Sequence, residues 1–479
     1  MTAVDRLTLA TAARLPGALR PAVDPRDLEP RVVHLGLGAF HRAHQAVYTE
    51  TAAARTGEPW GIAAVAPRSR HVVTALREQD HLYSVTDREP GGPRVRVVGS
   101  LVRALHGGDD ADEVTALLAA PTTTVVTLTV TEKAYHRRPG TTELDTAAPA
   151  VAADLAADRP ATAVGRLAHG LAARARAGGA PISVVSCDNT AGNGAVLRGV
   201  VRGYVESSPW PDRERVLRWL DESAAFPSTV VDRIVPATSA ADERAAADAL
   251  GLRDAAAVAG EPYRQWVLQD RFAAARPAWE HDGALLVPDV TPYQLTKLRL
   301  LNGCHSALAY LGAAAGCATV REVLHTRWGE RFVRAFGAEV AATLPPGGPE
   351  PTAYVDELVR RFGNPAMRHE LRQIGSDGSL KVPERWFDPL RALDRAPLLE
   401  LALAGWVAST RPGDDGPVFG TTDPLADRLA DPWHDRLAPA DLVAALLRLV
   451  GAPDLADRAD LTAAVAAHLP ALRAGRIEF

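Results

Sequence analysis

The segment from Arg31 to Arg55 constrains the fold most, because it joins a short apolar strand to a helix through a glycine turn. Arg31 to Gly36 (RVVHLG) predicts a buried strand, and a helix is expected from about Arg42 to Arg55. Gly36 and Gly38 lie between them. This order is typical of the opening of a dinucleotide-binding fold, where glycines let the backbone approach a pyrophosphate near a helix N-terminus. Only two of the usual three glycines are present, so the pattern alone is weakly specific.

Strand and helix patterns alternate up to about residue 285 and then become helical only. The further predicted strands cover 60–66, 82–86, 95–102, 122–130 and 181–186. The helices expected in the second half cover 292–315, 320–327, 331–342, 353–362, 389–409, 439–449 and 460–474. Strands that alternate with helices favour a parallel sheet covered on both faces. We therefore expect an α/β domain over residues 1–285 and a mostly α-helical domain over residues 286–479.

Composition excludes several classes of protein. The chain has 479 residues, a formal net charge of −5, and apolar and charged fractions of 47% and 23%. The apolar and charged fractions are ordinary for a globular protein. The negative net charge argues against a protein that binds nucleic acid or an anionic membrane. With 3 cysteines there is no disulfide framework, and no uncharged apolar run reaches the ~18 residues that span a bilayer. We expect a cytoplasmic protein with neither nucleic-acid nor membrane partners.

Lysine and asparagine are scarce, while arginine is abundant. The only lysines are Lys133, Lys297 and Lys381, and the only asparagines are Asn189, Asn193, Asn302 and Asn364. Genome bias explains the scarcity but not the positions of the remaining residues. A buried lysine loses its proton far more readily than arginine does, so lysine is retained where a titratable amine is required.

Lys297, Asn302 and His305 lie together in the predicted helix 292–315. At about 100° per residue, His305 projects roughly 80° and Asn302 roughly 140° from Lys297, so the three share one broad face. Burial among leucines favours the neutral amine, which makes Lys297 a candidate general base. The alternative is a lysine that extends to solvent from a buried helix.

Three further polar segments follow predicted strands. The loop 186–194, which contains Asn193, is placed either to bind a developing alkoxide or simply to form a turn. Glu132 is a candidate for orienting water or substrate, or else a surface partner of Lys133. Asp232 and Arg233 are interpreted as a site or as a structural ion pair. His41 and His44 lack a third ligand, and no CxxC, GxSxG or P-loop pattern is present, so no metal site is expected.

Together these segments resemble the mannitol dehydrogenase family, the polyol-specific long-chain dehydrogenases and reductases that include mannitol 2-dehydrogenase and fructuronate and tagaturonate reductases. The matching blocks are HLGLGAFHRAHQ (34–45), TEKAY (131–135), SCDNTAGNG (186–194), VDRIVPAT (231–238), EPYRQWVLQDRF (261–272), PYQLTKLRLLNGCHSALAYLG (292–312) and DGSLKVP (377–383). They occur in family order from residue 34 to residue 383. The resemblance implies a Rossmann-like NAD(P)-binding domain, a helical substrate domain, an active site between them and metal-independent hydride transfer.

The resemblance also implies roles for individual residues. Lys297 corresponds to the general base, and Asn193 and Asn302 to the pair that holds the substrate oxygen. Substrate contacts are expected at His305, Glu132 and Lys381. Cofactor contacts are expected at Gly36, Gly38, Phe40, Val231 and Asp232.

Three positions depart from the family pattern. Gln294 stands where a glutamate is usual, and Ser228 where asparagine is common. No acidic residue follows the second strand, where an NAD-preferring enzyme usually carries one; Arg68 and Arg70 are there instead. Either arginine suits a 2′-phosphate, so both NAD and NADP remain candidate cofactors.

Several substrates fit the sequence. The first expectation is the D-mannitol and D-fructose pair. Fructuronate or tagaturonate, a mannitol 1-phosphate, and a non-catalytic dinucleotide-bound sugar sensor are the alternatives. A sugar or polyol is the expected partner, and both a monomer and a homodimer are compatible with the sequence.

Overall fold

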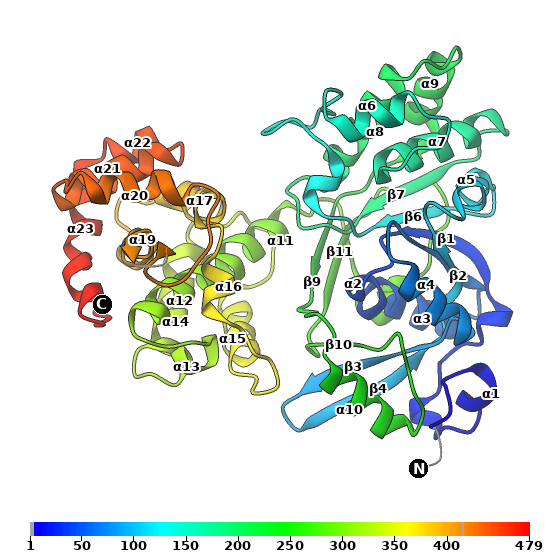
Figure 1. Cartoon of the computed structure of the whole chain (residues 1–479), viewed down its shortest axis with the longest axis horizontal. Coiled ribbons are helices and arrows are strands. Elements are labelled where there is room, and N and C mark those ends of the chain that lie inside the picture. The colour runs from blue at the N-terminus through cyan, green and yellow to red at the C-terminus, as the bar shows by residue number, and fades with distance from the viewer. Residues whose placement is uncertain (1–3, 414–415) are drawn as a thin grey trace. The chain divides into compact units, whose positions relative to one another are not determined.

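The structure is a computed structural model that describes residues 4–413 and 416–479 (Figure 1). The chain divides into two compact units, Met1–Val290 and Thr291–Phe479. Within the described residues, no helix combines the length and the apolarity that crossing a membrane requires.

A parallel sheet forms the centre of the first unit, as the alternating pattern predicts. Its strands are, in spatial order, β5 (Leu101–His106), β2 (Trp60–Ala66), β1 (Glu29–Leu35), β6 (Val125–Leu128), β7 (Ile182–Ser186) and β8 (Ala224–Ala225). Every neighbouring pair runs parallel. The chain builds outward from β1 through β2 to β5 and then returns to the other side of β1 to form β6. The strand order therefore reverses between β1 and β6.

Helices cover both faces of this sheet (Figure 1). The helices of the first unit are α1 (Leu9–Ala12), α2 (Ala39–Ala43), α3 (Gln45–Thr56), α4 (Arg70–Glu78), α5 (Ala111–Ala119), α6 (Pro149–Leu155), α7 (Ala163–Arg176), α8 (Asn193–Ser207), α9 (Arg213–Ser223) and α10 (Ala240–Leu250). Successive strand residues point to opposite faces. Accordingly, Val32 of β1 packs in one core with α3 and α4, and Val33 packs in another with α5, α7 and α8.

Two smaller sheets complete the first unit. One has the order β10 (Val258–Gly260), β3 (Tyr83–Glu89) and β4 (Gly92–Val98), and the other β12 (Leu285–Val287), β11 (Gln265–Gln269) and β9 (Thr229–Asp232). The single strand predicted over 95–102 is wrong, because the chain leaves one sheet at Val98 and enters another at Leu101. An apolar run does not reveal that its hydrogen-bonding neighbours change.

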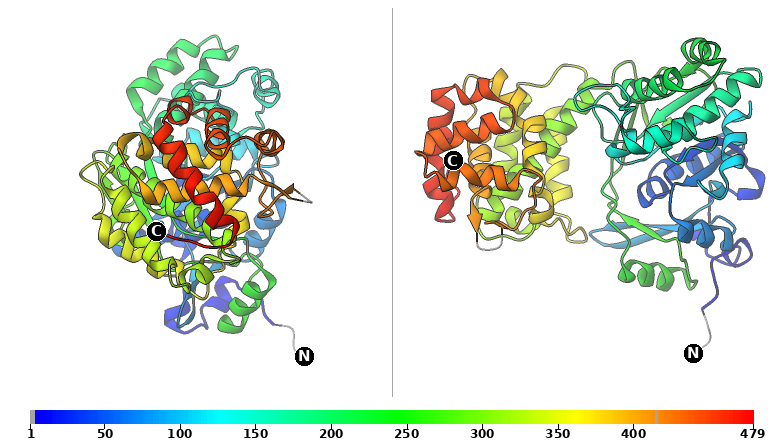
Figure 2. Two further views of the ribbon diagram at one scale, coloured as in Figure 1. Left: turned by 90° about the vertical axis from the view of Figure 1, so that its left-hand side faces the viewer. Right: turned by 45° about the horizontal axis from the view of Figure 1, so that its top comes forward.

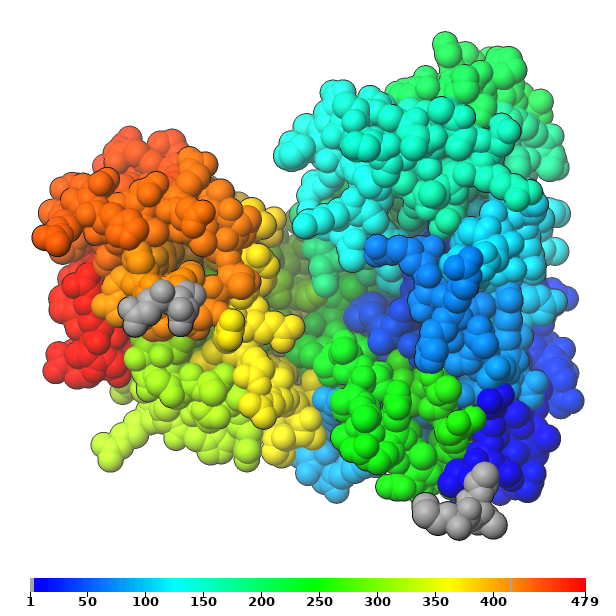
Figure 3. All heavy atoms as spheres, viewed as in Figure 1, coloured from blue at the N-terminus to red at the C-terminus, as the bar shows by residue number. Residues whose placement is uncertain are grey.

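The N-terminal segment packs against residues far along the sequence. The Leu7 amide donates to the Arg253 carbonyl oxygen at 2.9 Å, and Arg6 forms a bridge with Arg253. In Figure 3 the dark blue N-terminal residues lie against the green residues of this later segment.

In its described residues, the second unit is helical apart from two short antiparallel strands (Figure 2). Its elements are α11 (Thr291–Thr296), η5 (Lys297–Asn302), α12 (Gly303–Ala314), α13 (Val320–Leu324), α14 (Gly329–Ala341), α15 (Pro351–Phe362), α16 (Leu371–Gly375), α17 (Gly378–Val382), η6 (Pro383–Phe387), α18 (Asp388–Ala392), α19 (Pro397–Ser409), β13 (Pro412–Gly413), β14 (Gly416–Pro417), α20 (Ala426–His434), α21 (Pro439–Leu449), α22 (Pro453–Ala456) and α23 (Ala459–Arg473). Both η5 and η6 are π-helical turns.

The helix predicted over 292–315 is therefore not α-helical throughout, since η5 interrupts it. The α12 and α19 helices are buried on nearly all sides, as expected of helices at the centre of a core. The η5 turn therefore leads directly into a buried helix.

Candidate active site

The first unit has a pocket where its strand order reverses. In open α/β sheets, ligands bind beyond the carboxyl ends of the strands at this point. A pocket of about 390 Å³ lies there, and its lining residues are Phe40, Thr129, Val130, Thr131, Glu132, Cys187, Asp188, Asn189, Thr190 and Val231. These include three residues that sequence analysis singled out, Phe40, Glu132 and Val231, which come from separate segments of the chain.

The turn after β1 requires glycine at its first position. Gly36 has φ +122°, and a Cβ built there would lie 2.1 Å from the carbonyl oxygen of Thr129. Gly38 is exposed immediately before α2, where its carbonyl accepts from the Arg42 amide. The backbone thus passes close to the end of β6, and no side chain obstructs the approach to Gly38.

His34 joins this turn to β6. Its Nε2 lies 3.0 Å from the Gly36 carbonyl oxygen and 2.8 Å from the Thr129 hydroxyl, and its Nδ1 lies 2.7 Å from the Thr127 hydroxyl. A carbonyl oxygen only accepts, so Nε2 carries the hydrogen and Nδ1 accepts from Thr127. Burial lowers the pKa of His34 to about 3, so the ring stays neutral. The sequence does not reveal this role, because a histidine within a strand carries no signal of its partners.

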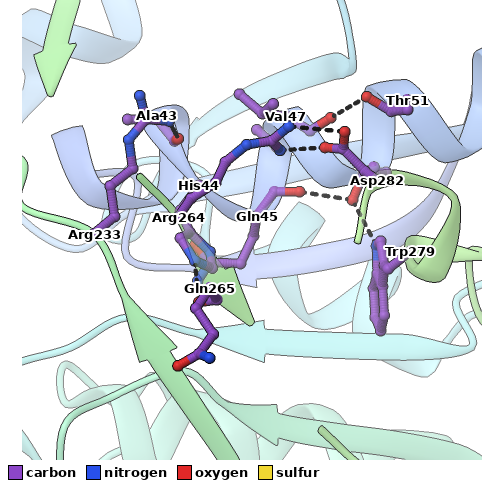
Figure 4. A network of polar contacts seen from close by, with 12 residues as sticks. Ala43, His44, Gln45, Val47, Thr51, Arg233, Arg264, Gln265, Trp279 and Asp282 are labelled. Atoms are coloured by element: carbon purple, nitrogen blue, oxygen red, sulfur yellow. Dashed lines mark hydrogen bonds and ion pairs between the residues drawn. The ribbon is translucent and has the colours of Figure 1, made fainter. Parts of the chain in front are cut away.

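A second buried network holds α2 and α3 in place (Figure 4). His44 Nε2 lies 2.9 Å from the Gln265 carbonyl oxygen, and burial lowers the pKa of His44 to about 3. The Trp279 indole donates to the Thr49 hydroxyl at 3.0 Å, and Arg264 pairs with Asp282. The helix that follows the glycine turn is thus tied to β11 and to η4 (Trp279–Asp282).

Arg233 belongs to the same network but is not paired with Asp232. Its guanidinium pairs with Asp87 and donates to the carbonyl oxygens of Ala43 and Glu261. The ion pair suggested by their adjacency in sequence is therefore corrected to a contact across 146 residues. Asp232 is buried at the end of β9, next to the pocket-lining Val231.

The Asn193 side chain is bound to backbone groups on both ends of its amide. Its Oδ1 accepts from the Thr229 amide at 2.9 Å, which identifies the oxygen, since that amide only donates. Its Nδ2 donates to the carbonyl oxygens of Asp188 and Thr229 at 2.9 and 3.0 Å. Both Nδ2 hydrogens are therefore engaged, and Asn193 joins the loop after β7 to β9.

Asp188 is a titratable group of the pocket that sequence analysis did not single out. Its carboxylate accepts from the Val130 amide at 2.8 Å and from the Tyr135 hydroxyl at 2.5 Å. Burial raises the pKa of Asp188 to about 7, above its ordinary value. The loops that follow β6 and β7 are therefore joined through this carboxyl.

Glu132 lies on the exposed rim of the pocket. Its partner is Arg137, and not Lys133 as adjacency suggested. Glu132 begins the short helix η3 (Glu132–Tyr135), with Thr131 preceding it. An exposed carboxylate at a pocket rim remains available to a ligand.

The two arginines after β2 differ. Arg70 makes a bidentate pair with Asp109, with distances of 2.7 and 2.5 Å, whereas the exposed Arg68 makes no ion pair within the described residues. Arg68 is therefore the more available of the two cations.

In the second unit, Lys297 and Asn302 begin and end one π-helical turn. Lys297 is 9% exposed, and Asn302 is half-buried. The Gly303 amide donates to the Leu298 carbonyl oxygen, five residues earlier. An α-helix separates residues five apart by about 140°, and the wider π-turn makes this angle smaller. The backbone winding thus brings the positions of Lys297 and Asn302 nearer to one face than an α-helix would.

His305 packs against two other rings. Its ring stacks on Phe362 with centroids 5.2 Å apart and meets His369 at 5.4 Å. Burial, followed by His369, Arg385, Arg361 and Lys381, holds the pKa of His305 well below its usual range.

Lys381 donates to the carbonyl oxygens of Ile374 and Ser376 at 3.2 and 2.7 Å. It therefore binds the end of α16 in this structure. Burial lowers the pKa of Lys381, with a further contribution from Arg385.

Gln294, the residue that departs from the family pattern, is half-buried on α11, three residues before Lys297.

Arg385 also contacts the π-helical turn, although sequence analysis did not identify it. Its guanidinium donates to the Asn302 carbonyl oxygen at 3.2 Å and to the Ser306 hydroxyl. Because arginine is abundant in this chain, the sequence alone did not distinguish Arg385 from the other arginines.

No group of three or more His, Cys, Asp or Glu residues suited to a metal ion occurs in the parts of the chain that the structure describes.

The chain matches two family models that together cover most of its length. The Mannitol dehydrogenase Rossmann domain matches residues 30–281, and the Mannitol dehydrogenase C-terminal domain matches residues 289–473. The family expected from the sequence and its two-part fold class are thereby confirmed.

Individual relatives agree with these matches. D-mannonate oxidoreductase of Escherichia coli (strain K12) is 38% identical over 475 residues, which cover 96% of each chain. The structure of Pseudomonas fluorescens mannitol 2-dehydrogenase in ternary complex with NAD and D-mannitol matches with a TM-score of 0.81 and 31% identity, covering 98% of this chain and 97% of that one. A D-sorbitol dehydrogenase in substrate-free form matches with a TM-score of 0.85 and 29% identity, covering 98% and 100%. The chain belongs to the mannitol dehydrogenase family and is an oxidoreductase with a Rossmann-like N-terminal domain and a helical C-terminal domain.

Proposed function

We propose that the chain is an NAD(P)-dependent dehydrogenase that interconverts a secondary alcohol and a ketone of an open-chain sugar. The observation that carries this proposal is the placement of a buried lysine and an asparagine on one π-helical turn, in a chain whose relatives are polyol and sugar-acid oxidoreductases. We assign the base to the second unit and the dinucleotide site to the first.

Lys297 and Asn302 supply the proposed proton chemistry. During oxidation, neutral Lys297 takes the hydroxyl proton, and the Asn302 amide donates to the oxygen on which negative charge develops. During reduction, protonated Lys297 returns the proton to that oxygen. Bound nicotinamide dinucleotide supplies the complementary hydride transfer. The family resemblance implies that Asn193 binds the same oxygen. To do so, its Nδ2 must give up one of its two hydrogen bonds to backbone carbonyl oxygens and donate to the substrate oxygen instead.

The residues of the first unit suit a dinucleotide. The Gly36 turn leaves no room for a Cβ, and Phe40 and Val231 line the pocket beside it. We assign the dinucleotide to this pocket, with Gly38 near the pyrophosphate. NAD is supported by the complex of the Pseudomonas fluorescens relative. The exposed Arg68 supports NADP as well, since its charge is available to a 2′-phosphate.

Two substrate classes are compatible with the proposal. D-mannitol and D-fructose are the pair expected from the sequence, and mannitol 2-dehydrogenase is among the relatives. A sugar acid is also supported, because Arg361, Arg385 and Lys381 all lower the pKa of His305, whereas His369, with a pKa of about 4, is neutral at ordinary pH. A substrate carboxylate would be attracted to this cluster of cations. The Escherichia coli relative named for D-mannonate also supports the sugar acid.

The first experiment is an absorbance assay at ~340 nm, the nicotinamide band. It tests NADH and NADPH separately with D-fructose, D-fructuronate, D-tagaturonate and fructose 6-phosphate. We expect turnover with a uronate to exceed turnover with D-fructose. Turnover confined to D-fructose would restore the polyol assignment, and turnover confined to the phosphate would indicate a mannitol 1-phosphate dehydrogenase. A preference for NADH above about tenfold, or about 1.4 kcal/mol, would reject NADP.

Lys297→Ala is the matched control for this assay. We expect it to lower kcat by roughly 100-fold or more, the range that general acid–base catalysis supplies, while the dinucleotide still binds. Dinucleotide binding without turnover of any substrate by the unsubstituted protein would instead indicate a sugar sensor.

A further inference from the structure

Two π-helical turns of the second unit contact each other through side-chain donors. Arg385 and Trp386 lie on η6, and the carbonyl oxygens that they bind lie where η5 passes into α12. The Arg385 guanidinium donates to the Asn302 carbonyl oxygen, and the Trp386 indole donates to the Gly303 carbonyl oxygen, each at 3.2 Å. Arg385 also donates to the Ser306 hydroxyl, one turn into α12. The carbonyl oxygens of two successive residues, Asn302 and Gly303, therefore accept side-chain hydrogen bonds at this junction.

The junction is where the winding changes. Gly303 closes a hydrogen bond to a residue five earlier, and the helix that follows returns to ordinary α winding. π-helical turns are rare and occur often at functional sites, and a change of winding alters which carbonyls are bonded within the helix. The donors of η6 bind at this point.

Ion pairing does not explain the position of Arg385. Its recorded hydrogen bonds go to a peptide carbonyl and a hydroxyl, and the described residues include no carboxylate in an ion pair with it. Burial lowers the pKa of Arg385, which shows that its surroundings oppose the charge. A desolvated guanidinium is stabilised here chiefly by dipoles of the η5–α12 junction.

We propose that Arg385 is a positioning residue that keeps the Asn302 amide on the face of Lys297. It holds the carbonyl of Asn302 itself and, through Ser306, the first turn of the helix that follows. Loss of these contacts allows the junction to relax toward α winding, in which Asn302 turns to about 140° from Lys297. This inference rests on the proposed catalytic roles of Lys297 and Asn302.

The test is a double-mutant cycle between Arg385 and Asn302 in the full-length protein. The variants are Arg385→Gln, Arg385→Lys, Asn302→Ala and the double variant Arg385→Gln with Asn302→Ala, assayed with the most active substrate of the absorbance panel. We expect Arg385→Gln to lower kcat by up to roughly 100-fold, as small misplacements of catalytic groups do. The KM for the dinucleotide should change less than about twofold, as expected when the loss falls on the reacting step. Arg385→Lys, which keeps one charged donor, should recover part of the loss.

The cycle separates positioning from a general structural role. If Arg385 acts through Asn302, Arg385→Gln should have little further effect in the Asn302→Ala background. An undiminished effect in that background would overturn the inference, as would a wild-type kcat for Arg385→Gln. Should Lys297→Ala and Asn302→Ala both keep full activity, the proposed function itself would fail, which is a separate outcome.

Arg458→Gln is the matched stability control. Arg458 donates to the carbonyl oxygens of Leu390 and Asp394 at 2.7 and 3.0 Å, and so it also binds backbone in the second unit without touching η5. We expect it to lower the melting temperature while leaving kcat unchanged. A fall in kcat equal to that of Arg385→Gln would show that destabilisation alone explains the effect, and would overturn the inference.

Discussion

Glu50 is a carboxyl group buried inside the first unit. Its Oε1 accepts from the Gly99 and Ala22 amides at 2.8 and 3.2 Å, and the residue is 3% exposed. Burial raises the pKa of Glu50 to about 7 from 4.5. The two amides reduce this shift but do not cancel it.

The Glu50 carboxyl makes stability depend on pH in a defined direction. Between pH 4.5 and about 7 the folded protein holds a proton that the unfolded chain releases, so stability falls as the pH rises. The loss amounts to roughly 3 kcal/mol from this one group. Glu50→Gln keeps the accepting oxygen and has no charge, so its free energy of unfolding should fall less over this interval.

Urea denaturation of both proteins at several pH values measures this difference. Glu214→Gln, at an exposed residue on α9, is the control and should leave the dependence unchanged. Parallel pH profiles for Glu50→Gln and the unsubstituted protein would contradict the prediction.

At the scale of elements, the glycine turn depends on β6 as much as on its own glycines. His34 bridges β1 to Thr127 and to the Gly36 carbonyl oxygen, and its pKa of about 3 keeps the bridge uncharged at ordinary pH. The turn is therefore held in one conformation before a ligand arrives, which reduces the ordering cost of binding.

His34→Phe removes these hydrogen bonds and keeps a flat ring. We expect the Kd for NADH, measured by fluorescence titration, to rise about tenfold, or about 1.4 kcal/mol. For the unsubstituted protein, His34 should contribute no inflection in Kd near pH 6.5, because the ring is already neutral there.

Thr123→Val is the control for this turn. It removes a buried hydroxyl near the opposite end of β1, where Thr123 donates to the Pro30 carbonyl oxygen. Equal effects of the two substitutions would show that the loss comes from general destabilisation of the sheet.

At the scale of the whole molecule, each unit has its own core. One cluster contains buried residues from Leu300 to Leu472, and the other clusters contain only residues of the first unit. Units with separate cores are able to unfold separately.

Hydrogen exchange in increasing urea should therefore give different midpoints for peptides of the two units. NADH at about 100 times its Kd should stabilise the unit that binds it by about 2.7 kcal/mol. We expect the larger shift in peptides of Met1–Val290, which contain the pocket. One common midpoint for all peptides would contradict this expectation.

Local sequence determined much of the architecture. The predicted segments 60–66 and 439–449 coincide with β2 and α21, because the apolar pattern of each matches the period of its element. The motif blocks also identified the family. Helix periodicity predicted one broad face for Lys297 and Asn302, but it did not show the π winding between them, because the same residue pattern fits either winding.

Only the tertiary structure decided which polar groups meet. Asp87 pairs with Arg233, and Arg385 binds Asn302, although 146 and 83 residues separate these pairs. A pattern of residue types fixes which face of an element is apolar, because that property is local. The partner of a buried polar group depends on where distant segments come to lie, and the roles of His34, Asp188 and Arg385 were visible only after folding brought those segments together.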